Sequence, residues 1–287
     1  MTTIELIPSL LRASLDGDKK TVEASALMIV KKIKKENPEI AEEIAKIIKQ
    51  SLEKEGFDVV YVGVHSDGTL DLDELRKNVD ESTALVAVMY ANNEVGTVQP
   101  IELIAEIAHS VGAYMFTDAV QAVGKVPMNL AELPIDMLSL SGHKFHGPKG
   151  VGALYVRRGF PLVNIIDGGA QERGKRAGTE NLAGIMGMVA ALEDACQNLD
   201  ENTAKVTALR DKLIAGLSQI PHCARNGDPD HCLPGIVSFC FEGIEGESLL
   251  LWLDMKGIGA SSGSACTSGS LDPSHVLLAL GLPHEIA

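Results

Sequence analysis

Long apolar runs and basic residues are what this sequence lacks most clearly. No apolar run reaches the roughly 18 residues that a membrane-spanning helix needs, and residues 1–5 do not begin a basic segment followed by an apolar one, as in a secretory signal. Lys and Arg number 25 against 39 Asp and Glu, so the net charge is −14. Because phosphate backbones are bound by basic surfaces, this charge argues against a nucleic-acid binder. We expect a cytoplasmic protein that binds neither membranes nor nucleic acids.

Cysteine is also scarce, and its count of five is odd. Without a secretory signal, an odd number favours reduced thiols over a disulfide framework. Only Cys266 has a distinctive context, since small residues flank it on both sides in Ser262-Gly263-Ser264-Ala265-Cys266-Thr267-Ser268-Gly269. This context predicts an accessible, reactive thiol. The pairs His222-Cys223 and His231-Cys232 fit no regular zinc spacing, so we expect no metal site.

The chain is predicted to have a helical start followed by an α/β body. Residues 1–51 show apolar positions at helical spacing, as in Ile40, Ile44 and Ile47, and carry no catalytic signature. From Phe57 onward, short β-branched runs alternate with helical patterns. Strands are predicted over residues 58–64, 84–90, 113–117, 136–140 and 152–156, with a helix over 101–111. Because these runs are apolar throughout, we expect a largely parallel sheet with flanking helices, buried on both faces.

The sheet domain is assigned to residues 52–180 and a smaller α+β domain to residues 181–287. The smaller domain is expected to carry the loop that contains Cys266. Its predicted elements are helices over 182–198, 203–220, 247–256 and 275–280, and a strand over 236–241.

Two residues whose side chains could take part in a reaction follow predicted strands. In parallel sheets, ligands bind beyond the carboxyl ends of the strands. Lys144 lies there, and a lysine held at such a place can form a Schiff base; a lone strand-end lysine can equally be a surface charge. Asp118 ends another strand, where a carboxylate can pair with a pyridinium nitrogen. The other interpretation of Asp118 is a helix N-cap.

An ordered set of motifs resembles the cysteine desulfurases of the NifS/IscS type, within the class V aminotransferase superfamily. The resemblance extends from about Leu52 to Ala287. The motifs are Ala91-Asn92-Asn93-Glu94-Val95-Gly96, Thr117-Asp118-Ala119-Val120-Gln121, Ser139-Leu140-Ser141-Gly142-His143-Lys144, Arg176-Ala177-Gly178-Thr179-Glu180-Asn181 and Ser262-Gly263-Ser264-Ala265-Cys266. The resemblance implies a fold of the PLP-transferase type, with an incomplete large domain.

It also implies a cofactor, pyridoxal 5′-phosphate, and roles for residues around its ring. Lys144 would hold the cofactor covalently and carry protons. Asp118 would pair with the pyridinium nitrogen, and Gln121 would bond the ring hydroxyl. Asn93 would bond the ring hydroxyl or the substrate carboxylate.

Further roles concern the phosphate and the sulfur. By resemblance, Ser141 and His143 would help to bind the cofactor phosphate, while Thr179 would reach the phosphate of the partner subunit in a homodimer. Cys266 would take the sulfur of L-cysteine as a persulfide, leaving L-alanine. The loop over residues 267–277 resembles the long-loop subgroup, in which a mobile loop delivers sulfur to an iron–sulfur scaffold protein.

The sequence departs from the family at both ends. The Gly-Ala-Thr-Glu turn that binds the phosphate and the histidine that stacks on the ring are not found, and residues 1–51 contain no histidine. The arginine that binds the substrate carboxylate is also absent before the last residue, Ala287. We therefore predict weak cofactor occupancy and slow turnover, since each missing charge-assisted hydrogen bond contributes about 1.5–3 kcal/mol.

Two other functions stay open at this point. The nearest is a selenocysteine lyase or a class V aminotransferase, from which an exposed thiol at Cys266 would distinguish a desulfurase. The second belongs to a different class, an inactive truncated protein of this fold whose helical start is a binding module.

Overall fold

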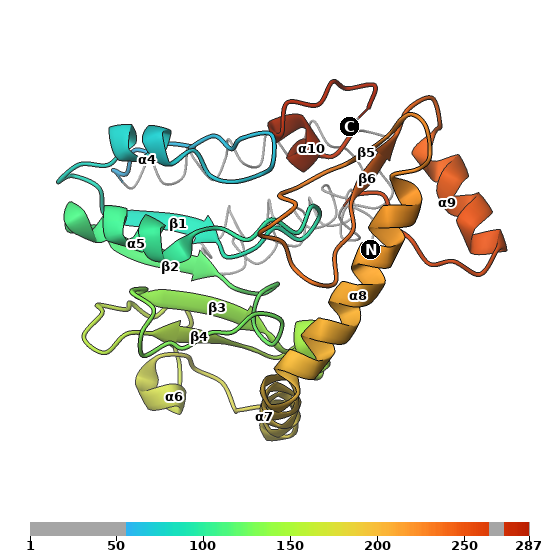
Figure 1. The fold of residues 1–287 in the computed structure, drawn as a ribbon. Helices are drawn as coiled ribbons and strands as arrows, with labels where there is room; N and C mark the ends of the chain where they lie inside the picture. Colours follow the sequence, from blue (N-terminus) through green and yellow to red (C-terminus); the bar gives the residue numbers. More distant parts are fainter. Residues whose placement is uncertain (1–55, 264–272, 287) are drawn as a thin grey trace, which may run out of the picture. The chain divides into compact units, whose positions relative to one another are not determined.

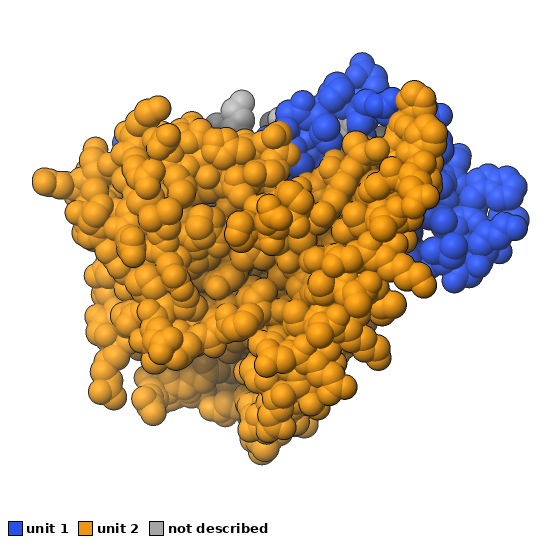
Figure 2. Space-filling view, in the orientation of Figure 1, with its two compact units in different colours: residues 1–61, 241–287 blue, residues 62–240 orange. Residues whose placement is uncertain are grey.

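The computed structural model describes residues 56–263 and 273–286. The predicted helices of residues 1–51, and Cys266 with its flanking residues, lie outside the described part. The chain divides into two compact units, one of residues 62–240 and one of residues 1–61 with 241–287 (Figure 2). The domain limits at residues 51 and 180 stay predictions.

The larger unit is built around a four-stranded sheet. Its strands run in the order β1 (Leu85–Met89), β2 (Tyr114–Asp118), β3 (Met137–Ser141) and β4 (Gly152–Val156). The first three are parallel and β4 is antiparallel to β3 (Figure 1). The prediction of a largely parallel sheet with flanking helices is confirmed.

The hydrophobic core lies on one face of this sheet. Helix α5 (Ile101–Ser110) connects β1 to β2 and contacts both strands (Figure 1). Its Ile104 is fully buried, as are Met115 of β2 and Leu138 of β3. The alternate positions are open, since Leu85 and Tyr114 are more than 40% exposed. The prediction that the strands are buried on both faces is therefore wrong for β1 and β2, because the core covers only one side.

Four of the remaining helices agree with the periodicity of the sequence. The predicted ones are α7 (Leu182–Gln197), α8 (Leu199–Leu217), α9 (Gly246–Met255) and α10 (His275–Ala279). Helix α4 (Leu72–Asn78) was missed; Asp71 caps it by accepting from the amides of Asp73 and Glu74. None of the helices in the described part is both long enough and apolar enough to span a membrane.

Short elements complete the described part. They are the 3₁₀ helix η1 (Gly142–Phe145), the helix α6 (Gln171–Gly174), and the strands β5 (Cys223–Arg225) and β6 (Phe239–Phe241), which pair with each other.

The predicted strand over residues 58–64 is wrong. Only Val64 makes an isolated bridge, with Leu70, and the side chains of Val60 and Tyr61 are more than half exposed. A strand requires a partner for its backbone groups, and none of the strands in residues 56–263 and 273–286 pairs with this segment. Its β-branched composition alone is therefore not enough to make it a strand.

Candidate active site

The parallel register brings the sequence-predicted residues to one edge of the sheet. Asp118, the last residue of β2, lies opposite Met89 of β1 and Ser139 of β3. The backbone continues the alignment, since the Tyr90 amide donates to the Asp118 carbonyl at 2.8 Å and the Ala119 amide donates to the Ser139 carbonyl at 3.0 Å. The segments that follow β1, β2 and β3 therefore start from the same carboxyl edge, where ligands bind in open α/β sheets.

Strand alternation places Asp118 on the open face of the sheet. Its neighbour Thr117 is fully buried, and side chains of successive strand residues point to opposite faces. By register, Ser139 shares the face of Asp118, and so does Ser141 two residues further on. The side chains of Asp118 and Ser141 thus lie on the face of the sheet that is opposite to α5.

The Asp118 carboxylate combines a local turn with a free oxygen. Its Oδ1 accepts from the Val120 amide at 2.9 Å, and the residues that follow form turns instead of a regular helix. Asp118 therefore makes the side-chain bond to a following amide that an N-cap makes, but no helix begins here, so the N-cap interpretation is wrong. The other oxygen has no hydrogen-bond partner within the described residues and can accept from a ligand.

Lys144 lies in η1 with a half-buried side chain. Within the part of the chain that the structure describes, its amine has no hydrogen-bond or ion-pair partner. The backbone around it is well fixed, because the Gly142 amide donates to the Val151 carbonyl at 3.0 Å and the Gly147 amide closes the turn on the Gly142 carbonyl at 2.9 Å. Helix α7 contacts η1 and supports it. The amine is thus held on a fixed backbone and remains available.

Gln121 and Lys125 form a bonded pair in the turns after β2. The Lys125 amine donates to the Gln121 side-chain oxygen at 3.1 Å. Burial, and secondarily the positive charge of Lys144, lower the pKa of Lys125 below its ordinary value. The Lys144 charge therefore acts on Lys125, the residue that holds the Gln121 side chain.

The residues predicted to bind phosphate are only partly brought together. The Ser141 hydroxyl and Nδ1 of His143 are hydrogen-bonded at 2.8 Å, so they form one polar pair beside Lys144. Thr179 is exposed in the loop before α7, and no hydrogen bond joins it to that pair. Its predicted role across a subunit boundary stays a prediction.

The turn after β1 is built by Asn92, while Asn93 stays a candidate ligand. Asn92 Oδ1 accepts from the amides of Glu94 and Val95 at 2.8 and 3.0 Å, which folds the turn. Asn93 is half-buried beside it. The sequence motif therefore contains one residue that shapes the backbone and one whose proposed role is to bind a ligand.

Sequence reasoning missed a loop over residues 226–233 that clasps this turn. The Asp228 amide donates to the Thr97 hydroxyl at 3.1 Å, and the Leu233 amide donates to the Gly96 carbonyl at 2.8 Å. Val98 donates in turn to the His231 carbonyl at 2.9 Å. The sequence Asn226-Gly227-Asp228 is typical of a turn, but no local signal shows that the loop docks on a segment so distant in sequence.

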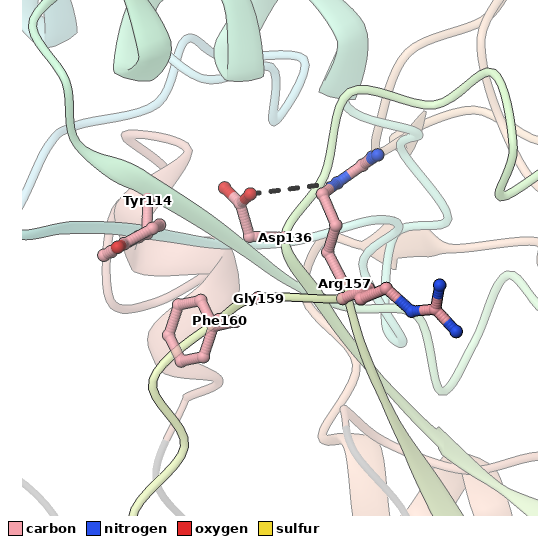
Figure 3. Close-up of a pocket in the computed structure, with 6 residues that line it drawn as sticks. Tyr114, Asp136, Arg157, Gly159 and Phe160 are labelled. Carbon is pink, nitrogen blue, oxygen red and sulfur yellow. Dashed lines mark ion pairs between the residues drawn. The ribbon is translucent and has the colours of Figure 1, made fainter.

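A shallow pocket lies at the opposite, amino edge of β2 and β3 (Figure 3). The Asp136 carboxylate, which is largely buried there, accepts from the Met115 amide at 2.8 Å and from His109 at 2.9 Å, and it lies 3.9 Å from Arg157 Nε. Tyr114 and Phe160 make an edge-to-face contact at 4.6 Å between ring centres. Because its acid bonds the β2 backbone and His109 and pairs with Arg157, we interpret this pocket as structural.

The family described as aminotransferase class-V matches residues 39–282. The chain belongs to this family. A cysteine desulfurase IscS of Clostridium botulinum is 52% identical over 241 residues, which cover 83% of this chain and 61% of that protein. A cysteine desulfurase of Gluconacetobacter diazotrophicus is 54% identical over 233 residues, covering 81% and 58%. The chain thus spans about three-fifths of the length of the curated relatives it matches.

Solved structures show the same class-V aminotransferase fold. A NifS-like protein superposes with a TM-score of 0.75 at 34% identity, covering all of this chain and 73% of that one. A structure titled "SspA in complex with cysteine" gives a TM-score of 0.69 at 35% identity, covering 83% and 66%. The resemblance inferred from the motifs is confirmed.

Pyridoxal phosphate, the cofactor of class-V aminotransferases, fits the side chains at this edge. The available amine of Lys144 suits its aldehyde, and the free oxygen of Asp118 suits its ring nitrogen. Ser141 and His143 supply donors that suit its phosphate. Among the described residues, no group of three or more His, Cys, Asp or Glu is arranged to hold a metal ion.

Proposed function

We propose that this chain is a pyridoxal-phosphate-dependent cysteine desulfurase, which removes the sulfur of L-cysteine and leaves L-alanine. The observation that carries the proposal is the available, half-buried amine of Lys144 at the same sheet edge as the free oxygen of Asp118. The relatives named cysteine desulfurase support this choice within the family.

The chain's own residues have distinct tasks in this proposal. Lys144 binds the cofactor and moves a proton to and from the substrate carbon. Asp118 keeps the proton on the ring nitrogen, and Ser141 with His143 binds the phosphate. The bound cofactor supplies an electron sink for the negative charge that develops on the substrate.

Cys266 is proposed to receive the sulfur. Its thiolate attacks the sulfur of the bound substrate, so that a sulfur–sulfur bond forms and the carbon–sulfur bond breaks. The electron pair of the broken bond goes to carbon, which takes up a proton to become the methyl group of alanine. One thiol and one cysteine thus give one persulfide and one alanine, and no external oxidant is required. The acceptor is proposed to be an iron–sulfur scaffold protein, which the IscS name of several relatives supports.

A cytoplasmic homodimer is part of the same proposal. Apolar side chains that are at least 40% exposed gather between residues 154 and 189, and they are Leu154, Val163, Ile165, Ile166, Leu182, Met186 and Val189. Exposed apolar side chains mark protein interfaces where they form a contiguous patch, and we propose that these do. Thr179 lies within the same stretch of chain, which supports its proposed role at the boundary between two copies.

Mass spectrometry of the purified chain tests the function directly. The protein is incubated with pyridoxal phosphate and reduced with borohydride, and a second sample is incubated with L-cysteine. We expect a pyridoxyl group on Lys144 and an added sulfur on Cys266, with alanine in solution. Lys144→Ala should lose the first label, whereas Lys149→Ala, at an exposed lysine in the adjacent turn, should keep it.

Cys266→Ala separates the proposal from its rivals. We expect this variant to keep the label on Lys144 and to lose both the persulfide and alanine formation. Unchanged turnover would indicate an aminotransferase or a selenocysteine lyase. A wild-type chain that labels at neither residue would indicate the non-enzymatic alternative.

A further inference from the structure

Lys125 lies beside the candidate site although no motif pointed to it. Its backbone is fixed by the turn after β2, where the amides of Lys125 and Val126 donate to the Ala122 carbonyl at 2.9 and 3.1 Å. The preceding Gly124 has a positive φ of 75°, and a Cβ there would lie 3.1 Å from the Cβ atoms of Phe145 and Ala195. The turn that carries Lys125 is thus pressed against the residue that follows Lys144.

The contact between Lys125 and Gln121 determines which way the glutamine amide faces. An ammonium group has donors only, so the amide atom 3.1 Å from the Lys125 amine must be the oxygen. The NH₂ group of Gln121 therefore lies on the other side of the amide. Both side chains are half-buried, which limits competition from water for this bond.

Lys125 and Lys144 differ in the hydrogen-bond partners of their amines. Lys125 is paired with Gln121, whereas the Lys144 amine has no partner within the described residues. The lowered pKa of Lys125, which arises from burial first and from the charge of Lys144 second, agrees with their closeness. Lys125 can therefore act on the site through the amide of Gln121, or through its charge alone.

We propose that Lys125 is a positioning residue that fixes the Gln121 amide so that its NH₂ group donates to the ring oxygen of pyridoxal phosphate. This inference rests on the proposed function. A flipped amide would set its oxygen against the ring oxygen, where two acceptors repel each other. Lys125 excludes that orientation by holding the amide oxygen itself.

The expected effect is seen in the absorbance of the bound cofactor, independently of turnover. A hydrogen bond to the ionised ring oxygen stabilises its charge and weakens its hold on the proton of the linkage to Lys144. Lys125→Met should therefore move the pH of the absorbance transition upward by about one unit, a tenfold change in proton affinity. Affinity for pyridoxal phosphate should fall on the order of tenfold, as expected for one lost hydrogen bond to a charged group.

Three comparisons test the positioning role, and the last separates it from a plain charge effect. Lys125→Arg keeps both the donors and the charge and should leave the transition close to that of the unmodified chain. Lys149→Met removes an exposed charge elsewhere and should leave the transition unchanged. In a Gln121→Ala background, Lys125→Met should have little further effect, because the group it positions is gone. Thermal unfolding of each cofactor-free variant shows that the fold is retained.

The outcomes distinguish this inference from the proposed function. Effects of Lys125→Met and Gln121→Ala that add would overturn the positioning role and show that Lys125 acts by its charge. An unshifted transition in Lys125→Met would overturn it as well, with Lys144 still labelled by the cofactor. Failure of the wild-type chain to bind pyridoxal phosphate at Lys144 would instead overturn the proposed function, and this inference with it.

Discussion

Two lysines that influence each other electrostatically, Lys125 and Lys144, illustrate how the site is organised at the scale of single residues. Partly burying an ammonium group without a partner costs free energy, and such groups are usually found paired. Lys125 follows that rule through Gln121, and Lys144 does not among the described residues. An amine kept available in this way is a common property of lysines that react with carbonyl groups.

Asp228 gives a prediction for pH dependence at the same scale. Burial alone would raise the pKa of this carboxyl group. Hydrogen bonds from the amides of His231 and Asp230, and the contact with the His231 side chain, outweigh burial and lower the pKa below 3.8. Because the folded value lies below the unfolded one, the stabilisation is full above the unfolded pKa and is lost as pH falls through the folded pKa.

The Asp228→Asn variant should therefore be less stable at neutral pH, and its stability should depend less on pH. We expect its free energy of unfolding, measured with urea between about pH 6 and pH 3, to fall less steeply than that of the unmodified chain. Asp73→Asn, at an exposed position of α4, is the control and should keep the original slope. Parallel curves for all three proteins would contradict the assigned role of Asp228.

At the scale of elements, short turns and loops position the site more than the helices do. The segment after β1 that carries Asn92 and Asn93 is clasped by the loop over residues 226–233. Gly227 allows this docking, because its φ is +86° and a Cβ there would lie 2.5 Å from the Val95 carbonyl oxygen. A side chain at this position would push the two loops apart.

Gly227→Ala should destabilise the larger unit through both strain and this clash. Gly150→Ala is a matched control, since Gly150 has φ of +85° and nothing within 4 Å of the added Cβ. The cost of a side chain at positive φ, roughly 1–2 kcal/mol, is common to both variants. Only Gly227→Ala adds the clash with Val95, so we expect its free energy of unfolding in urea to be lower than that of Gly150→Ala by a further ~1 kcal/mol or more. Equal losses of stability in the two variants would show that the loops move apart without a cost in free energy, and would contradict this prediction.

At the scale of the whole molecule, several strongly exposed apolar side chains follow one another in a single stretch of the chain. The exposed apolar residues between positions 154 and 189 include Ile165, which is 88% exposed. An isolated apolar side chain on a surface is ordinary, whereas a concentration of them indicates an interface. This concentration lies in the same stretch as Thr179, which the family resemblance assigns to a subunit boundary.

Ile165→Asp should therefore weaken the proposed homodimer. A carboxylate in an apolar interface must be buried without a partner, which costs several kcal/mol and shifts the equilibrium to the monomer. Sedimentation velocity over a range of protein concentrations measures this shift. Leu213→Asp, at a half-exposed position of α8, should leave the association unchanged. A chain that is monomeric at all concentrations before any substitution would refute the homodimer.

The sequence by itself determined the longer described helices, the four strands of the sheet and the family, because these depend on local periodicity and on residue identities in order. Strand β4 was predicted at its observed limits, and α5 within one residue of its end. The residues at the carboxyl edge were also found from sequence, since Lys144 and Asp118 follow predicted strands. The segment over residues 58–64 could not be judged in this way, because a strand exists only where a partner supplies its hydrogen bonds.

Only the tertiary structure decided which face of the sheet is covered and which side chains meet. Register and alternation placed Asp118 on the open face, and no local pattern carries that information. The pairing of Lys125 with Gln121 and the docking of residues 226–233 on the Asn92 turn also depend on packing. Each of these contacts forms because the fold brings the two groups together in space, and no local sequence pattern records that distance.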